Sequence, residues 1–165
     1  MNEHRAPWCR TLVLMSVLVT ALCGGLSAWL AFGPQYVPAW VPALPVAILA
    51  GGALFIVRGY AIAPDGLLIR RLLWTTRLPL AGIESARHDP QAMRGSLRLF
   101  ANGGLYSFSG WFRSRSLGTY RAFVTDPSRA IVLRVSGKHV LVSPGEPARF
   151  LRELAVLHPA VADRA

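Results

Sequence analysis

Charged residues are scarce in this chain and are missing altogether from one long stretch. Only 16% of the 165 residues are Asp, Glu, Lys or Arg, against roughly 25% in a typical soluble domain. Hydrophobic residues make up 53%, and the mean hydropathy is +0.39. These values argue against intrinsic disorder and against a fibrous repeat. The few charges are also one-sided, because 18 Lys and Arg outnumber 8 Asp and Glu. A chain that is both apolar and basic is typical of a membrane protein with a positive soluble part.

No Asp, Glu, Lys, Arg or His occurs from Thr11 to Val57, a run of 47 residues. A bilayer core about 30 Å thick needs about 20 helical residues, so this run predicts two crossings joined by a turn. We place the first span at Thr11–Phe32 and the second at Val41–Val57. The segment 33–40 between them contains Gly and Pro, which break helices. The residues therefore predict an α-helical transmembrane hairpin over 11–57.

The cations that flank this run predict its orientation. Arg5 and Arg10 precede the first span and Arg58 follows the second, whereas the turn between the spans carries none. Under the positive-inside rule both termini face the cytoplasm, which predicts a multi-pass protein of the inner membrane. The alternative is a cleaved signal peptide. The first span is long for one, and no clean cleavage site follows it.

Cysteine is nearly absent, which excludes a disulfide framework. Cys9 lies at the predicted membrane edge and Cys23 lies inside the first span, so we expect two free, inert thiols. Two pairs of glycines, Gly24-Gly25 and Gly51-Gly52, fall within the spans. Because small residues let membrane helices approach closely, we expect these pairs at the contact between the two helices.

Residues 58–158 alternate apolar and polar side chains with period two, which predicts short antiparallel strands with one buried face. Turn signals separate the strands at Pro64-Asp65-Gly66, Asn102-Gly103-Gly104 and Ser136-Gly137. The predicted organisation is a cytoplasmic tail at 1–10, the hairpin, a cytoplasmic β domain at 58–158 and a tail at 159–165. The predicted strands include Tyr60–Ala63, Leu67–Leu73, a third from Arg77 to Ala86 broken at Pro79, Leu97–Leu99, Tyr106–Ser109, Tyr120–Val124, Ile131–Val135 and Val140–Val142.

The end of the domain changes to helical spacing. Phe150, Leu154 and Leu157 recur at intervals of three and four residues. The segment Ser143-Pro144-Gly145-Glu146 reads as a capping box with Ser143 as the N-cap, and Pro159 is expected to end the helix. We therefore expect one amphipathic helix that closes an open end of a rolled sheet.

Several short motifs follow one another in a particular order along residues 58–157. They are Tyr60, Pro64-Asp65-Gly66-Leu67, Ile69-Arg70-Arg71, Leu80, Ile83, Asn102-Gly103-Gly104-Leu105, Gly110, Phe112, Gly118, Tyr120, Thr125, Val142-Ser143-Pro144 and Phe150.

This series resembles the bacterial PH-like domain family, in which a pleckstrin-homology (PH) superfold follows one or two membrane spans. The resemblance implies a rolled antiparallel sheet or barrel capped by a C-terminal helix. It also implies a membrane-associated binding or scaffolding module without catalysis. Phosphoinositide-binding PH domains place cations in the first hairpin, whereas the corresponding turn here, Pro64-Asp65-Gly66, has none. The resemblance therefore does not imply phosphoinositide binding.

Residue patterns for catalysis or metal binding are missing. None of the four histidines is followed three or four residues later by a metal-ligating residue, and no phosphate-binding loop, nucleophile elbow or dinucleotide fingerprint occurs. His88 and Asp89 are neighbours that could form an acid–base pair, but they lack further partners. We therefore predict no enzyme activity, no cofactor and no metal.

Arginine is the one functional residue type that is plentiful. It binds phosphate and carboxylate with a planar fork, so the candidate contacts to an anionic lipid surface are Arg58, Arg70, Arg71, Arg98, Arg113, Arg115 and Arg121, with Asn102, Gly103 and Gly104 as the family-like turn. The alternative is that these arginines are merely solvated strand faces. Near them we expect Phe112 in the core, and we leave Trp111 open between core and membrane interface.

The partners that follow are membrane lipids and a protein partner or a second copy of the chain. A membrane anchor argues against nucleic acid, and no small-molecule substrate is indicated. The predicted function is a non-enzymatic, membrane-anchored binding module at the cytoplasmic face. The alternative is an accessory subunit of a membrane transporter or sensor.

Overall fold

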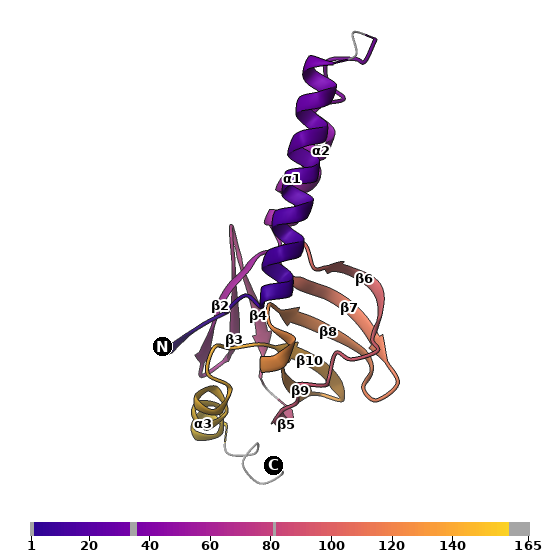
Figure 1. The fold of residues 1–165 in the computed structure, drawn as a ribbon. Helices are drawn as coiled ribbons and strands as arrows, with labels where there is room; N and C mark the ends of the chain where they lie inside the picture. Colours follow the sequence, from indigo (N-terminus) through magenta and orange to yellow (C-terminus); the bar gives the residue numbers. More distant parts are fainter. Residues whose placement is uncertain (1, 34–35, 81, 159–165) are drawn as a thin grey trace.

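The computed structural model describes residues 2–33, 36–80 and 82–158, which form an apolar helical stalk on a mainly β body (Figure 1). Helix α1 runs over Arg10–Phe32 and buries only Leu12 and Ser16. Helix α2, Ala43–Ala53, returns alongside it. Among the described residues, α1 alone is long and apolar enough to cross a membrane. The first predicted span is therefore confirmed as a helix.

The second predicted span is shorter than expected. Helix α2 has 11 residues, whereas a crossing needs about 20. The helix starts after Pro42, because proline lacks the N–H that a continuous helix needs. It ends at Ala53, because the chain turns at 54–55 and enters a strand at Val57. Tight turns precede the helix instead: the Val41 N–H donates to the Pro38 carbonyl at 3.0 Å, and the Ala43 N–H donates to the Trp40 carbonyl at 3.1 Å.

The body consists of two sheets. The first has the order β1-β2-β3-β4 and the second the order β5-β9-β10-β8-β7-β6. A 3₁₀ turn, Pro127–Arg129, links β8 to β9, and helix α3, Pro147–Leu157, follows the last strand. The strands are β1 Asn2–Arg5, β2 Val57–Ala63, β3 Gly66–Arg71, β4 Thr75–Pro79, β5 Ile83–His88, β6 Leu97–Gly103, β7 Phe108–Ser114, β8 Gly118–Val124, β9 Ile131–Val135 and β10 Lys138–Val142.

Three strand predictions are corrected by the topology. The broken third strand is two strands in different sheets, since β4 ends at Pro79, which has no N–H to donate, and Gly82 then turns the chain at φ +79°. The second sheet is not purely antiparallel. Strand β10 lies between β8 and β9, and it pairs parallel to β8 and antiparallel to β9. The segment predicted as an N-terminal tail contains β1, which pairs with β2 from Arg5 opposite Gly59.

The C-terminal helix forms as predicted, but its start differs. Helix α3 begins at Pro147 with Glu146 at the N-cap, and it ends at Leu157, so the expected stop at Pro159 lies outside the described residues. Ser143 is buried instead, and its Oγ accepts the Thr125 N–H at 2.8 Å. The predicted capping box is therefore wrong, because the Ser143 hydroxyl is hydrogen-bonded between the ends of β10 and β8 and does not cap the helix. Helix α3 covers the end of the body remote from the stalk (Figure 1).

The main core lies between the two sheets and under α3. It joins Tyr60 and Ile69 of the first sheet to Phe123 and Leu133 of the second, and Phe150 of α3 closes it. Within this core the Tyr60 hydroxyl donates to the Phe123 carbonyl at 2.5 Å and accepts the Ser143 N–H at 3.2 Å. One buried hydroxyl therefore connects strands of both sheets.

The hairpin between β6 and β7 binds the stalk to the body. The Tyr106 N–H donates to Ser16 Oγ of α1 at 3.0 Å, and Ser107 Oγ donates to the Phe55 carbonyl just after α2 at 2.8 Å. At the foot of α1, the Cys9 N–H donates to the Thr125 carbonyl at 3.2 Å. The two helices are therefore held at the domain surface by hydrogen bonds from the β6–β7 hairpin and from Thr125 at the end of β8.

The glycine pairs are not at the helix contact. A Cβ atom placed on Gly24, Gly25 or Gly51 would meet nothing within 4 Å, whereas one on Gly52 would lie 2.5 Å from the side chain of Leu105. The predicted role of these pairs is therefore wrong. Gly52 makes room for the β6–β7 hairpin, and the other three face open space.

Replacing Tyr60 with Phe tests the buried hydroxyl. The variant leaves the Ser143 N–H and the Phe123 carbonyl without their partner in the core, so we expect it to lower the free energy of unfolding by roughly 1–3 kcal/mol. Denaturant unfolding of the full chain in detergent measures this. Tyr36→Phe is the matched control, because Tyr36 is 87% exposed. Equal stability of both variants would contradict the role of Tyr60.

The same hydroxyl predicts a pH dependence. Burial raises the pKa of Tyr60 to about 12, whereas the pKa in an unfolded chain is about 10. Above pH ~10 the unfolded chain therefore loses the proton while the folded protein keeps it, and stability falls by up to ~1.4 kcal/mol per pH unit. Thermal unfolding between pH ~9 and ~11 should show a smaller decline for Tyr60→Phe than for the wild type. Parallel declines would refute the assignment.

Gly110 tests the pairing of β6 with β7. Its φ is +132°, and a Cβ there would lie 2.5 Å from the Phe100 carbonyl oxygen and 2.6 Å from Ala101 Cα. Gly95→Ala is the matched control, since Gly95 also has positive φ but open space. The control loses only the left-handed freedom, about 1–2 kcal/mol. We expect Gly110→Ala to lose roughly 1–3 kcal/mol more, measured by denaturant unfolding, and an equal loss would count against the close approach.

Candidate functional site

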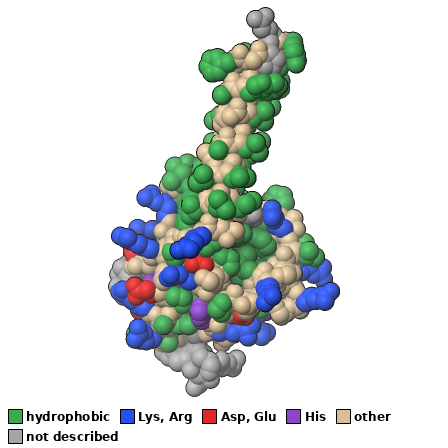
Figure 2. Space-filling view, viewed as in Figure 1, with side chains coloured by type: hydrophobic (Ala, Val, Ile, Leu, Met, Phe, Trp, Pro, Cys, Tyr) green, Lys and Arg blue, Asp and Glu red, His purple; other side chains and the backbone are tan. Residues whose placement is uncertain are grey.

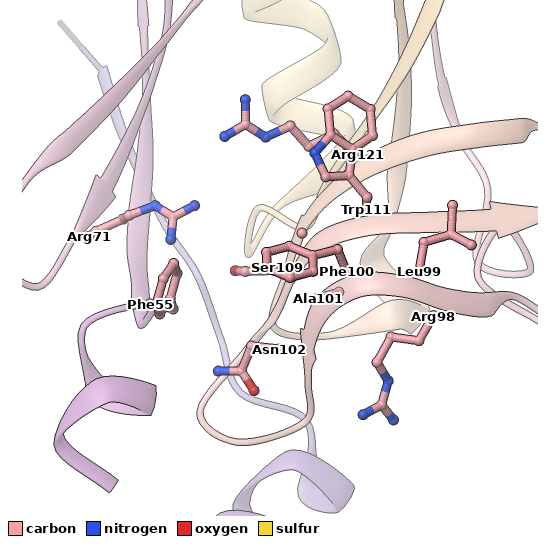
Figure 3. Close-up of a pocket in the computed structure, with 11 residues that line it drawn as sticks. Phe55, Arg71, Arg98, Leu99, Phe100, Ala101, Asn102, Ser109, Trp111 and Arg121 are labelled. Atoms are coloured by element: carbon pink, nitrogen blue, oxygen red, sulfur yellow. The ribbon is translucent and has the colours of Figure 1, made fainter. Parts of the chain in front are cut away.

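A cavity of about 620 Å³ opens between the end of β3 and the faces of β6, β7 and β8 (Figure 3). The cavity exists because six strands pack against four, so the outer strands of the larger sheet extend beyond their cover. By register, Phe100, Trp111 and Arg121 form one row across these three strands. The lining comprises Phe55, Arg71, Arg98, Leu99, Phe100, Ala101, Asn102, Ser109, Gly110, Trp111 and Arg121.

Arg71 is the buried charge of this cavity. Only 8% of the residue is exposed, and its guanidinium carbon lies 5.4 Å, 5.6 Å and 5.1 Å from the ring centres of Phe55, Trp74 and Phe123. Its Nε and Nη1 are buried without a hydrogen-bond partner. Aromatic faces attract a cation, but they satisfy none of its donors. The side chain therefore presents unused N–H groups in a place where leaving them unpaired is costly.

A second guanidinium lies beside the first. Arg121 is half-buried on β8, and its guanidinium carbon is 4.8 Å from the ring centre of the same Phe123. Burial first, and then repulsion from Arg121, lowers the pKa of Arg71, although an arginine remains charged. In Figure 3 the two guanidinium groups extend toward each other, whereas that of Arg98 points away.

Among the described residues, no acidic side chain lines the cavity to balance these charges. Within the same ranges no ion pair involves Arg71, Arg98 or Arg121. Six described carboxylates pair with other arginines. The remaining polar groups are engaged locally. Asn102 Nδ2 donates to the Leu105 carbonyl at 2.7 Å, and Ser109 Oγ lies 2.9 Å from Ser107 Oγ. The cavity is therefore positive and otherwise mostly apolar.

The predicted turn motif lies at the edge of this cavity. Asn102 and Gly103 are the last residues of β6, and Gly104 begins the turn with φ +114°. The turn continues to Ser107, whose carbonyl accepts the Gly104 N–H at 3.2 Å. Tyr106, which was predicted within a strand, lies in this turn with φ +64°. The motif therefore ends a strand and orients the residues that contact the stalk.

The seven candidate arginines do not form a single site. Arg71, Arg98 and Arg121 line the cavity described above, and Arg71 also borders a second cavity with Arg58 and Arg70. Arg70 forms an ion pair with Glu3 of β1. The other two lie elsewhere, beside a cavity lined by Arg94, Leu97, Arg113 and Arg115. The structure thus divides the predicted set into three groups.

Sequence reasoning missed the aromatic part of the site. Phe55 falls inside the apolar run, where no pattern distinguishes it from a lipid-facing residue. Trp74 follows the end of β3 and packs edge-on against Phe55 with ring centres 5.9 Å apart. Phe112 is 5% exposed, as predicted, and Trp111, left open before, is 43% exposed and lines the cavity.

The neighbours His88 and Asp89 have separate partners. His88 Nε2 lies 3.3 Å from the Ser128 carbonyl, whereas Asp89 Oδ1 accepts the Gln91 N–H at 3.0 Å. Within the described ranges, no group of three His, Cys, Asp or Glu side chains could hold a metal ion. The arginine cavity is therefore the strongest candidate site.

Comparison with known proteins agrees with this fold. Residues 58–158 match the family model described as the bacterial PH domain, which covers more than half of the chain. No curated protein and no solved structure gives a significant match. PH domains are generally binding modules without catalysis. The sheets, the C-terminal helix and the family match agree, and this chain belongs to the bacterial PH domain family.

Proposed function

We propose that this protein is a membrane-anchored, non-enzymatic binding or scaffolding module, with its PH domain held at the cytoplasmic face by the helical hairpin. The observation that carries the proposal is α1. It has 23 residues, exposes apolar side chains on nearly every face, and is hydrogen-bonded at its base to the domain. Figure 2 shows hydrophobic side chains along the stalk and Lys and Arg on the body.

The length of the stalk bears on how deep the domain sits. Above Ser16, where the β6–β7 hairpin is attached, α1 rises roughly 25 Å to its end at Phe32. A bilayer core is about 30 Å thick, so a crossing hairpin draws the domain surface into the headgroup layer. Trp8 and Trp74 are exposed and pack against Tyr106 of the hairpin and Phe55 at the foot of the stalk, and aromatic residues favour the interface.

Charge supports the cytoplasmic orientation. Arg5 and Arg58 lie on strands at the base of the stalk, and Arg10 begins α1. The turn at its far end carries no cation in the sequence. Lys and Arg are enriched on the cytoplasmic side of membrane proteins, which favours the cytoplasm for the domain and both termini.

A second candidate function is supported by the glycines of the stalk. Gly24, Gly25 and Gly51 face open space, and small residues let another membrane helix approach closely. The stalk would then pack against a larger transporter or sensor, with the PH domain as its accessory docking part.

Cell fractionation and reporter fusions test the anchor. We expect the full chain to remain in the membrane pellet after an alkaline carbonate wash, and a reporter that is active only in the cytoplasm to work at either end. Leu22→Arg should weaken insertion by about 3 kcal/mol and shift protein out of the pellet.

Val156→Arg is the matched control, because Val156 is at least as exposed as Leu22 (79% against 67%) but lies on α3 of the body. A silent reporter at either end, or a wild-type chain in the soluble fraction, would refute the proposed anchor. Stoichiometric co-purification of one membrane protein with the wild type would favour the accessory-subunit alternative.

A further inference from the structure

The cavity at Arg71 lies at the foot of the stalk. Phe55, which lines it, follows α2 by two residues, and its carbonyl is bound by Ser107 of the β6–β7 hairpin. Trp74, which contacts both Phe55 and Arg71, lies in the same place. In the membrane-anchored arrangement this is the depth at which lipid headgroups lie.

We propose that this cavity binds the phosphate group of an anionic membrane phospholipid between Arg71 and Arg121. The inference rests on the proposed membrane anchor and adds a ligand and a site to it. Arg71 lines the cavity, and its Nε and Nη1 are buried without partners among the described residues, so a small rotation of the guanidinium would turn spare donors to the ligand. Arg121 supplies a second fork from β8. A phosphate oxygen can accept from each guanidinium, which satisfies the donors and neutralises the repulsion between the two cations.

The apolar lining identifies the ligand as a lipid rather than a free anion. Phe55, Phe100 and Trp111 surround the arginines, and Phe100 is 84% exposed. A soluble phosphate has no use for such walls, whereas the glycerol and the first acyl carbons of a phospholipid do. Alkyl chains leaving the cavity past Phe55 run directly onto α2. An acidic protein segment is less suitable, because the cavity is beside the membrane helices and its walls are mainly apolar.

The site differs from the first hairpin that phosphoinositide-binding PH domains use. The corresponding β2–β3 turn here contains Pro64 and Asp65, and Asp65 pairs with Arg77 at 3.0 Å. The proposed site instead uses the end of β3 and the middle of β8, on the inner side of the sheets. Stacking on aromatic rings alone is the competing explanation for Arg71, and it predicts no effect of any lipid.

Native mass spectrometry, which preserves non-covalent complexes, tests the site. The full chain in uncharged detergent is titrated with phosphatidylglycerol, with phosphatidylcholine and with glycerol 1-phosphate. We expect one phosphatidylglycerol per chain, bound in preference to the other two. Arg71→Met and Arg121→Gln should each weaken its binding about tenfold. Methionine fills the space between the aromatic rings, so Arg71→Met should unfold no more easily than the wild type.

Arg115→Gln is the matched control, because it removes the same charge from an exposed position outside the cavity. We expect it to bind phosphatidylglycerol as the wild type does. An equal loss with Arg115→Gln would indicate general surface attraction and overturn the site. Glycerol 1-phosphate bound as tightly as the lipid would identify a soluble phosphate ligand, and preference for a hexaglutamate peptide would identify a protein-docking site; either result overturns the proposal.

A failure of the proposed lipid site can be distinguished from a failure of the proposed membrane anchor. A chain that stays in the washed membrane pellet but binds phosphatidylglycerol no better than phosphatidylcholine retains the proposed function and loses the lipid site. Arg121→Gln, at a half-buried position, keeps the test valid if Arg71→Met fails to fold.

Discussion

Two sheets of unequal width share one core, and the difference in their widths determines where the cavity forms. Four strands cover part of a six-stranded sheet, and the hydroxyl of Tyr60 joins the two where they overlap. Helix α3 covers the core at the β5 side with Phe150 and Leu154. At the other side β6 and β7 extend beyond the first sheet, so their inward residues face a cavity instead of a core. An open side of a sheet domain exposes apolar side chains and backbone groups, and here it lies beside the stalk.

The stalk and the cavity are joined through the same hairpin. Residues just after β6 bind α1 at Ser16 and the chain after α2 at Phe55. Phe55 in turn forms one wall of the cavity and stacks with Arg71. A charge buried among aromatic rings with unpaired donors is costly in a protein interior. Its position beside the stalk is the physical reason to connect the proposed anchor with the proposed recognition of an anionic headgroup.

Much of the fold was predictable, because its signals are local. Alternation of apolar residues located nearly all strands of the domain, and the long uncharged run located α1. The errors arose where a residue acts through distant partners. The residues around Ser143 match a helix-capping sequence, yet the Ser143 hydroxyl accepts the backbone N–H of buried Thr125 instead. The β4–β5 break and the parallel β8–β10 pair depend on which sheet each strand joins, and period-two alternation is identical in either sheet. The glycine pairs have the small residues typical of a helix–helix contact, but Gly24, Gly25 and Gly51 face open space and Gly52 faces Leu105, so α1 and α2 contact each other through other residues.

The sequence by itself determined that the chain is apolar at one end, basic at the other, built of short strands closed by a helix, and similar to bacterial PH domains. Charge distribution and periodicity are properties of neighbouring residues, so they can be read without a fold. Only the tertiary structure decided which of the arginines share a site. Arg71 and Arg121 are 50 positions apart, and they share the ring of Phe123. Arg71 reaches that ring from the first sheet, whereas Arg121 lies two residues before Phe123 on β8. Arg113 and Arg115 are closer to Arg121 in the chain, but Arg113 lies near the end of β7 and Arg115 in the turn after it, so they border another cavity. Strand pairing, rather than sequence distance, decides which residues are neighbours.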